Sequence, residues 1–174
     1  MQNVSFSGAF PSWMNAANSA GRIVGGQSAE SFIGWQVSVR QCTAGFCHFC
    51  GGTILDATTV MSAAHCFTQG QSMSGFYVTA GVRDRNDEAN IGQTIGIANG
   101  VWNADMPYQG NNNDFVILKL SSALTFNDNV YPACLPDASH APEVETPAQT
   151  CFVSGWGTLV SGILIWIRGH SKTM

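Results

Sequence analysis

Charged side chains are scarce in this sequence. Lys, Arg, Asp and Glu together make up 10% of its 174 residues, whereas an average soluble domain has about 25%. Seven basic and eleven acidic side chains give a formal net charge of −4. Because proteins that bind nucleic acids use basic residues to neutralise phosphates, we expect no nucleic-acid partner.

Long hydrophobic runs are also missing. The longest apolar stretch covers residues 162–167, whereas a membrane-spanning helix needs about 20 apolar residues. Residues 1–22 show neither the basic start nor the apolar centre of a signal peptide. We therefore expect no membrane contact and no signal peptide in this sequence.

Cysteine, in contrast, is abundant, with six residues in the chain. Disulfides persist in oxidising compartments and are rare in the cytosol, where thiols are kept reduced. We therefore expect the protein to be extracellular.

No long stretch of the sequence has helical periodicity. Short β-like runs alternate instead with Gly, Asn and Asp, the pattern of an all-β barrel or sandwich. We expect one helical turn near residues 63–67. The expected strands are residues 35–40, 49–55, 58–62, 76–82, 91–97, 114–120 and 150–156.

Proline marks a change in organisation along the chain. Four of the six prolines fall within residues 131–148, and proline is excluded from central strands because it cannot donate to the ladder. We therefore predict a connector over 131–148 and a second unit that begins near Gln149. The residues after this point are too few to close a second barrel.

One histidine and one aspartate are candidates for chemistry. His65 follows an apolar run in the segment MSAAHC, and Asp114 leads into the apolar run FVILKL. A histidine titrates near pH 6.5, and its two ring nitrogens let it take a proton on one side while a carboxylate fixes the other. His65 is a candidate general base and Asp114 its orienting partner. Taken alone, His65 also fits a structural histidine and Asp114 a strand cap.

Four motifs occur in order along the chain. They are IVGG at 23–26, preceded by the basic Arg22, then AAHC at 63–66, NDFVILKL at 113–120 and SGWG at 154–157. Together they resemble the trypsin-like (chymotrypsin-fold, S1) serine endopeptidases over about residues 23–158.

The resemblance implies an antiparallel Greek-key β-barrel, the first of two. It divides the chain into a propeptide-like segment (1–22), the first barrel (23–130), an inter-barrel linker (131–148), the first strand of the second barrel (149–158) and a divergent tail (159–174). It also implies secretion as a zymogen.

The resemblance implies roles for particular residues as well. His65 is the general base and Asp114 its partner, and cleavage between Arg22 and Ile23 by an activating protease frees the mature N-terminus. The expected partners are protein or peptide substrates and protease inhibitors. No cofactor is expected.

The resemblance pairs Cys50 with Cys66. Cys42 and Cys47 are predicted to close a small local loop around Gly45, with free structural thiols as the alternative. A zinc site is a further alternative, although the adjacency of His65 and Cys66 makes joint tetrahedral coordination awkward. Its ligands would come from Cys42, Cys47, His48, Cys50, His65 and Cys66.

An acidic loop resembles the calcium loop of some trypsin-like proteases. It contains Asp84, Asp87 and Glu88. We expect a solvated charge cluster there and no bound metal.

The family's nucleophile motif is lacking. Neither Gly-Asp-Ser-Gly-Gly nor any G-x-S-x-G occurs in the sequence, so the nucleophile, the oxyanion hole and the specificity pocket are not expected in this chain. We therefore expect it to be truncated relative to the family and inactive alone. Cys134 and Cys151 are left without partners unless they pair with each other. The alternative is a non-catalytic homologue that acts as a binding or regulatory module.

Overall fold

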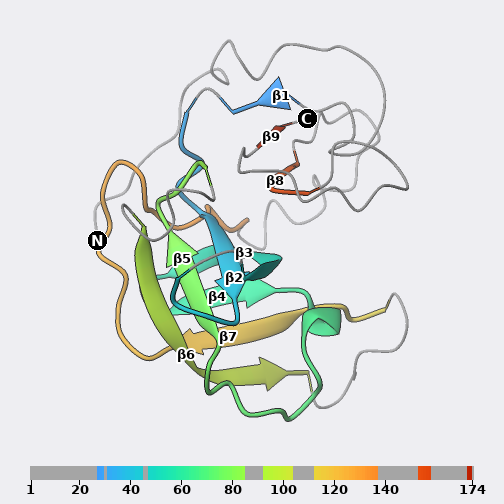
Figure 1. Ribbon diagram of the computed structural model, residues 1–174. Coiled ribbons are helices and arrows are strands. Elements are labelled where there is room, and N and C mark those ends of the chain that lie inside the picture. Colours follow the sequence, from blue (N-terminus) through green and yellow to red (C-terminus); the bar gives the residue numbers. More distant parts are fainter. Residues whose placement is uncertain are drawn as a thin grey trace.

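A computed structural model of the chain describes residues 27–29, 31–44, 47–84, 92–103, 112–136, 153–157 and 172–173. Six antiparallel strands form a closed barrel in the order β2-β3-β4-β7-β6-β5 (Figure 1). These strands are β2 (Gln36–Arg40), β3 (His48–Asp56), β4 (Thr59–Ser62), β5 (Tyr77–Ala80), β6 (Gln93–Trp102) and β7 (Val116–Leu120). The prediction of an all-β antiparallel barrel is confirmed.

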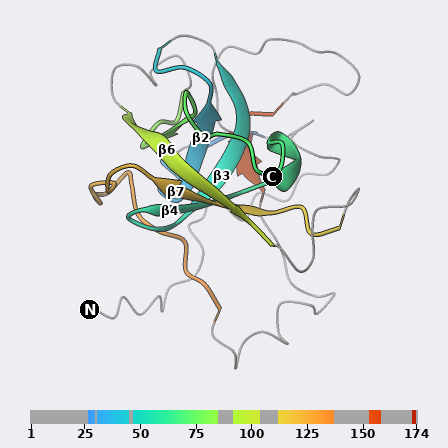
Figure 2. The ribbon, with the colours of Figure 1, turned by 90° about the horizontal axis from the view of Figure 1, so that it is seen from below.

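Alternating burial explains how the strands close around a core. In β7, Val116, Leu118 and Leu120 are buried while the residues between them are less so. In β2 both faces are covered, since Ser38 and Arg40 are fully buried together with the inward-facing Val37 and Val39. Since successive strand side chains point to opposite faces, one set fills the barrel interior. The view from below in Figure 2 shows β6 and β7 crossing β2 and β3, as tilted barrel strands do.

Strand positions match the expectation better than strand ends do. β6 runs on to Trp102, past the expected end at residue 97, after a register shift between Ile97 and Asn99. Such a bulge breaks the alternation from which a strand is recognised. β7 begins at Val116 instead of Asp114, because the backbone turns at Asn113, which has a positive φ of 57°.

A second, smaller sheet lies above the barrel in Figure 1. It contains β1 (Gln27–Ser28), β9 (Lys172–Thr173) and β8 (Ser154–Gly155) in the order β1-β9-β8. The pairing of the segment after residue 159 with the rest of the chain was not expected from the sequence. Trp156, just after β8, donates from its indole Nε1 to the carbonyl oxygen of Arg83 at 2.9 Å and so attaches β8 to the barrel.

The start of the predicted linker runs along the barrel. The backbone N–H of Tyr131 donates to the carbonyl oxygen of Gly34 at 3.1 Å, and that of Ala133 to Ile54 at 2.9 Å. A Cβ at Gly34 would overlap the Tyr131 ring, so glycine permits this close approach. The rest of the predicted linker, residues 137–148, lies outside the described residues.

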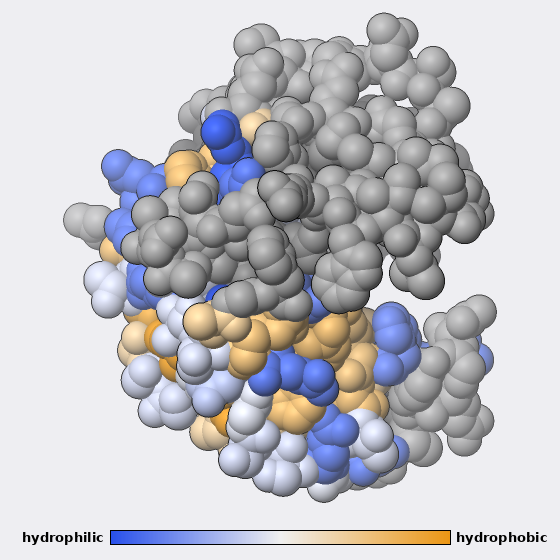
Figure 3. Space-filling view, in the orientation of Figure 1, coloured by the Kyte–Doolittle hydropathy of each residue, from blue (hydrophilic) through white to orange (hydrophobic). Residues whose placement is uncertain are grey.

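The surface of the described part is mixed in character. Figure 3 shows apolar and polar residues side by side on the face turned to the viewer. No helix in the described ranges is long and apolar enough to cross a membrane. The large apolar side chains that stay exposed are Met61, Val101, Phe115, Phe126, Leu135 and Val153.

Candidate active site

His65 lies in a single turn of 3-10 helix, η2 (Ala64–Cys66), just after β4. This turn is the green helix at the right of the barrel in Figure 1. The backbone N–H of Phe67 donates to the carbonyl oxygen of Ala64 at 3.0 Å and closes it. Ala64 is buried, because its small side chain lets the turn pack directly on the core. The His65 side chain remains 56% exposed.

Two sets of contacts hold η2 against the barrel. A disulfide joins Cys66 to Cys50 in β3. Beside it, the rings of Phe49, Phe67 and Phe76 meet edge to face with centroids 5.6 to 5.7 Å apart. Such aromatic pairs add stability beyond the area that they bury. The turn that carries His65 is therefore anchored to the core.

Asp114 contacts His65 through both of its carboxylate oxygens. Oδ1 accepts the backbone N–H of His65 at 2.8 Å, and Oδ2 lies 2.7 Å from the ring Nδ1. Because an ionised carboxylate only accepts, Nδ1 carries the hydrogen, and in the neutral ring Nε2 then keeps its lone pair. Nε2 lies 3.7 Å from Sγ of Cys66, a disulfide sulfur with no hydrogen to donate. His65 is thus set to accept a proton at Nε2.

The same hydrogen bonds lower the pKa of Asp114 below its ordinary value of 3.8. The largest cause is the hydrogen bond from the His65 ring, and the next is the backbone N–H of His65. Both stabilise the ionised carboxylate. Asp114 is therefore ionised at neutral pH, as the tautomer of His65 requires.

A groove of about 350 Å³ lies beside Asp114. Ser154 of β8 donates from Oγ to Oε1 of Gln36 at 2.8 Å, so both the barrel and β8 bound the groove. Gly52 is needed in its wall, because a Cβ there would lie 2.9 Å from Cγ1 of Val60. The residues that line the groove are Gln36, Gly51, Gly52, Thr53, Met61, Ser62, Ala63, Asp114, Phe115 and Ser154.

Four cysteines are joined in two disulfides, Cys50 to Cys66 and Cys42 to Cys47. Zinc binds cysteine as a thiolate, and a disulfide sulfur is not one. The donor atoms of Cys50, His65 and Cys66 do lie within 4.8 Å of one another, but the two sulfurs are bonded together. The disulfides therefore contradict the zinc alternative.

Other predicted positions have different outcomes. Cys134 is exposed and is the free thiol among the described cysteines, and Asp84 is half-buried. Several predicted residues lie outside the described residues, so the structure does not place them: Arg22, Ile23, Asp87, Glu88 and Cys151.

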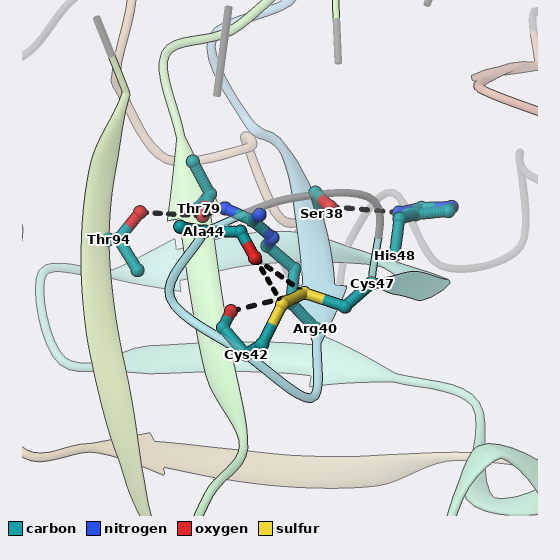
Figure 4. The surroundings of a disulfide bond; sticks show 8 residues. All are labelled: Ser38, Arg40, Cys42, Ala44, Cys47, His48, Thr79 and Thr94. Atoms are coloured by element: carbon teal, nitrogen blue, oxygen red, sulfur yellow. Dashed lines mark hydrogen bonds between the residues drawn. A yellow bond between two sulfur atoms is a disulfide. The ribbon is translucent and has the colours of Figure 1, made fainter. Parts of the chain in front are cut away.

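A second histidine cluster was missed by sequence reasoning, which considered His48 only as a zinc ligand. Ser38 Oγ lies 2.8 Å from Nδ1 of His48, and the His48 ring meets the Trp156 ring edge to face at 5.7 Å. Figure 4 shows Ser38 and His48 beside the disulfide of Cys42 and Cys47. The only sequence signal for this cluster is Trp156, in the SGWG motif.

A buried polar chain lies next to that disulfide (Figure 4). Arg40 is fully buried and donates from Nη1 to Oγ1 of Thr79 at 3.2 Å. Thr79 Oγ1 lies in turn 2.8 Å from Oγ1 of Thr94. These contacts link the outer faces of β2, β5 and β6, where sequence patterning predicts no buried charge.

Comparison with known proteins relates these features to a family. Residues 23–165 match the family model described as Trypsin, slightly beyond residue 158, where the motif resemblance was expected to end. Transmembrane protease serine 9 of Rattus norvegicus is 39% identical over 158 residues, which is 88% of this chain and 14% of that protein. Trypsin-1 of Astacus astacus is 34% identical over 144 residues, which is 80% of this chain and 59% of that protein.

This chain thus spans less than two thirds of the length of either relative. The family match nevertheless covers most of the chain, and the closed antiparallel barrel agrees with it. The predicted resemblance is confirmed, and the chain belongs to the trypsin-like (S1) family of serine proteases.

Proposed function

We propose that this chain provides the general base and its orienting carboxylate for a serine endopeptidase. The observation that carries the proposal is the pair of hydrogen bonds from His65 to Asp114, at 2.8 and 2.7 Å. They keep the Nδ1 hydrogen on the carboxylate side and leave Nε2 free to take a proton. Membership of the trypsin family supports the same reaction class.

In the proposed mechanism, Nε2 of His65 accepts the proton of a serine hydroxyl as its oxygen attacks the substrate carbonyl carbon. The ionised Asp114 stabilises the imidazolium that forms, and Nε2 then gives the proton to the leaving amine as the peptide C–N bond breaks. Asp114 stays ionised throughout. The substrates are proteins or peptides, and protease inhibitors are expected to bind the same site.

The proposal extends to processing and location. Cleavage of the Arg22–Ile23 bond by another protease frees the mature N-terminus at Ile23, which makes residues 1–22 a propeptide. Residues 23–130 form the first barrel, 131–148 the linker and 149–158 the first strand of the second barrel. The two disulfides support an extracellular location.

The 174-residue polypeptide by itself is proposed to be inactive. It contains no Gly-Asp-Ser-Gly-Gly motif, the motif that carries the nucleophile in this family. The same observation favours a second candidate function, a non-catalytic homologue that binds partners or regulates other proteases.

A fluorophosphonate probe, which labels activated serines, tests these statements. The natural protein that contains this sequence should be labelled after cleavage at Arg22–Ile23, and His65→Ala should abolish labelling. His48→Gln is the matched control, because it replaces the second hydrogen-bonded histidine described above and leaves His65 in place. The 174-residue polypeptide should not be labelled, and stoichiometric labelling would contradict its proposed inactivity. An unlabelled natural protein supports the binding module instead.

A further inference from the structure

The residue just before Asp114 has an uncommon backbone conformation. Asn113 has a φ of 57°, the only positive φ of a non-glycine residue in the ranges that the structure describes. Side chains with a Cβ avoid this left-handed region, and asparagine tolerates it better than most. The conformation is therefore a specific feature of the chain at this point.

The conformation produces a tight turn. The backbone N–H of Phe115 donates to the carbonyl oxygen of Asn113 at 2.8 Å, which closes a three-residue turn with Asp114 at its centre. β7 begins only after it, at Val116. Asp114 thus lies outside the regular strand.

The turn changes the direction of the Asp114 side chain. Val116, Leu118 and Leu120, at even positions of β7, are buried in the barrel. A regular extension of β7 would place residue 114 on that same buried face, because strand side chains alternate. The Asp114 side chain instead is 30% exposed and contacts His65.

We propose that Asn113 is a positioning residue of the active site, whose left-handed backbone turns Asp114 out of the β7 alternation so that both carboxylate oxygens reach His65. The catalytic consequence rests on the proposed function, but the geometry can be measured in this chain without any activity.

Backbone conformation, not a side-chain hydrogen bond, is the means. Among the hydrogen bonds between described residues, none involves the Asn113 side chain. What matters at this position is therefore how easily a residue adopts a positive φ. Glycine does so freely, alanine does so with difficulty, and a β-branched valine is the least suited.

NMR of the full 174-residue chain tests the proposal through two signals. One is the downfield resonance of the His65 Nδ1–H, and the other is the pH titration of the Asp114 carboxyl carbon. Asn113→Gly should preserve both. Asn113→Val should lower the equilibrium constant for the doubly bonded pair about tenfold, weaken the resonance and raise the pKa of Asp114 toward 3.8.

Gly75 provides a matched control. It has a φ of 84°, and a Cβ there would meet nothing within 4 Å. Gly75→Ala therefore introduces the same kind of backbone cost in a different turn. It should lower the melting temperature and leave both Asp114 signals unchanged.

The outcomes separate the two levels of the proposal. If Asn113→Val lowers the melting temperature as Gly75→Ala does but keeps both signals, the positioning role is wrong. If the valine variant does not fold, the same two signals are compared between Asn113→Ala and Asn113→Gly. If the unsubstituted chain itself lacks both signals, the Asp114–His65 pair is absent, and the proposed function fails with it.

Discussion

His65 and His48 have similar local settings. Each is next in sequence to a disulfide-bonded cysteine, Cys66 and Cys47 respectively. Each also has its ring Nδ1 within 2.8 Å of a side-chain oxygen. The oxygens differ, since His65 contacts the carboxylate of Asp114 and His48 contacts a hydroxyl.

The partner of Nδ1 determines what each histidine can do. A carboxylate only accepts, so it fixes the hydrogen on Nδ1 of His65 and leaves Nε2 as an acceptor. The hydroxyl of Ser38 can donate or accept, so it fixes no tautomer. His48 also lies half-buried against Trp156, whereas His65 is 56% exposed. One setting suits proton transfer, and the other attaches the segment around β8 to the barrel.

The largest expected effect comes from removing the carboxylate of the first setting. Asp114→Asn keeps the shape of the side chain but lets its amide donate, which favours the wrong His65 tautomer. In this family such a change lowers kcat about 10⁴-fold. We expect a loss of that order in peptide hydrolysis by the natural protein after cleavage at Arg22–Ile23.

Asp56 is the matched control for that substitution. The pKa of Asp56 is also lowered by hydrogen bonds, first of all from the backbone N–H of Thr58, but Asp56 is exposed at the end of β3. Asp56→Asn should leave kcat unchanged. An equal loss in both variants would mean that the carboxylate of Asp114 has no special role.

The two disulfides should differ in their contribution to stability. Cys50 and Cys66 are 16 residues apart, and Cys42 and Cys47 are five apart. Because a longer closed loop restricts the unfolded chain more, the Cys50→Ser/Cys66→Ser variant should lose about 3 kcal/mol of unfolding free energy and the Cys42→Ser/Cys47→Ser variant about 2 kcal/mol. Urea unfolding measures both, and the opposite order would contradict the loop-length argument.

The two histidine settings also differ in how far the sequence predicts them. His65 and Asp114 each lie beside an apolar strand and within a motif, so their pairing can be expected from the resemblance. The contact between Ser38 and His48 depends on the register of β2 and β3, which shifts at a bulge between Val39 and Arg40. A bulge has no sequence signal of its own here.

Other features escape sequence reasoning for similar physical reasons. β1 and β9 have two residues each, too few to show any alternation. The left-handed backbone of Asn113 is one that asparagine permits but does not dictate. The predictable part is the alternation that fills the barrel, and the unpredictable part is where that alternation stops.

A smaller effect is expected in the second setting. Ser38 is fully buried, and Ser38→Ala removes the oxygen that contacts Nδ1 of His48. Loss of one such hydrogen bond should lower the free energy of unfolding by about 1 kcal/mol. In urea unfolding this appears as a lower midpoint, with an unchanged dependence of the unfolding free energy on urea concentration. The downfield resonance of His65 Nδ1–H should not move. If it does, the two settings are coupled, and the distinction between them does not hold.

The smallest expected effect is a pH dependence that belongs to the first setting alone. The pKa of Asp114 is lowered in the folded chain by its hydrogen bonds to His65. Between that lowered pKa and the ordinary value of 3.8, the folded state therefore binds fewer protons than the unfolded state. The resulting stability is present above the ordinary pKa of 3.8 and is lost as the pH falls through the lowered value. Urea unfolding from pH 5 to pH 2 should therefore show a shallower loss for Asp114→Asn than for the unsubstituted chain. Ser38→Ala, which removes no carboxylate, should follow the slope of the unsubstituted chain, and a shallower slope in that variant would mean that the acid sensitivity does not come from Asp114.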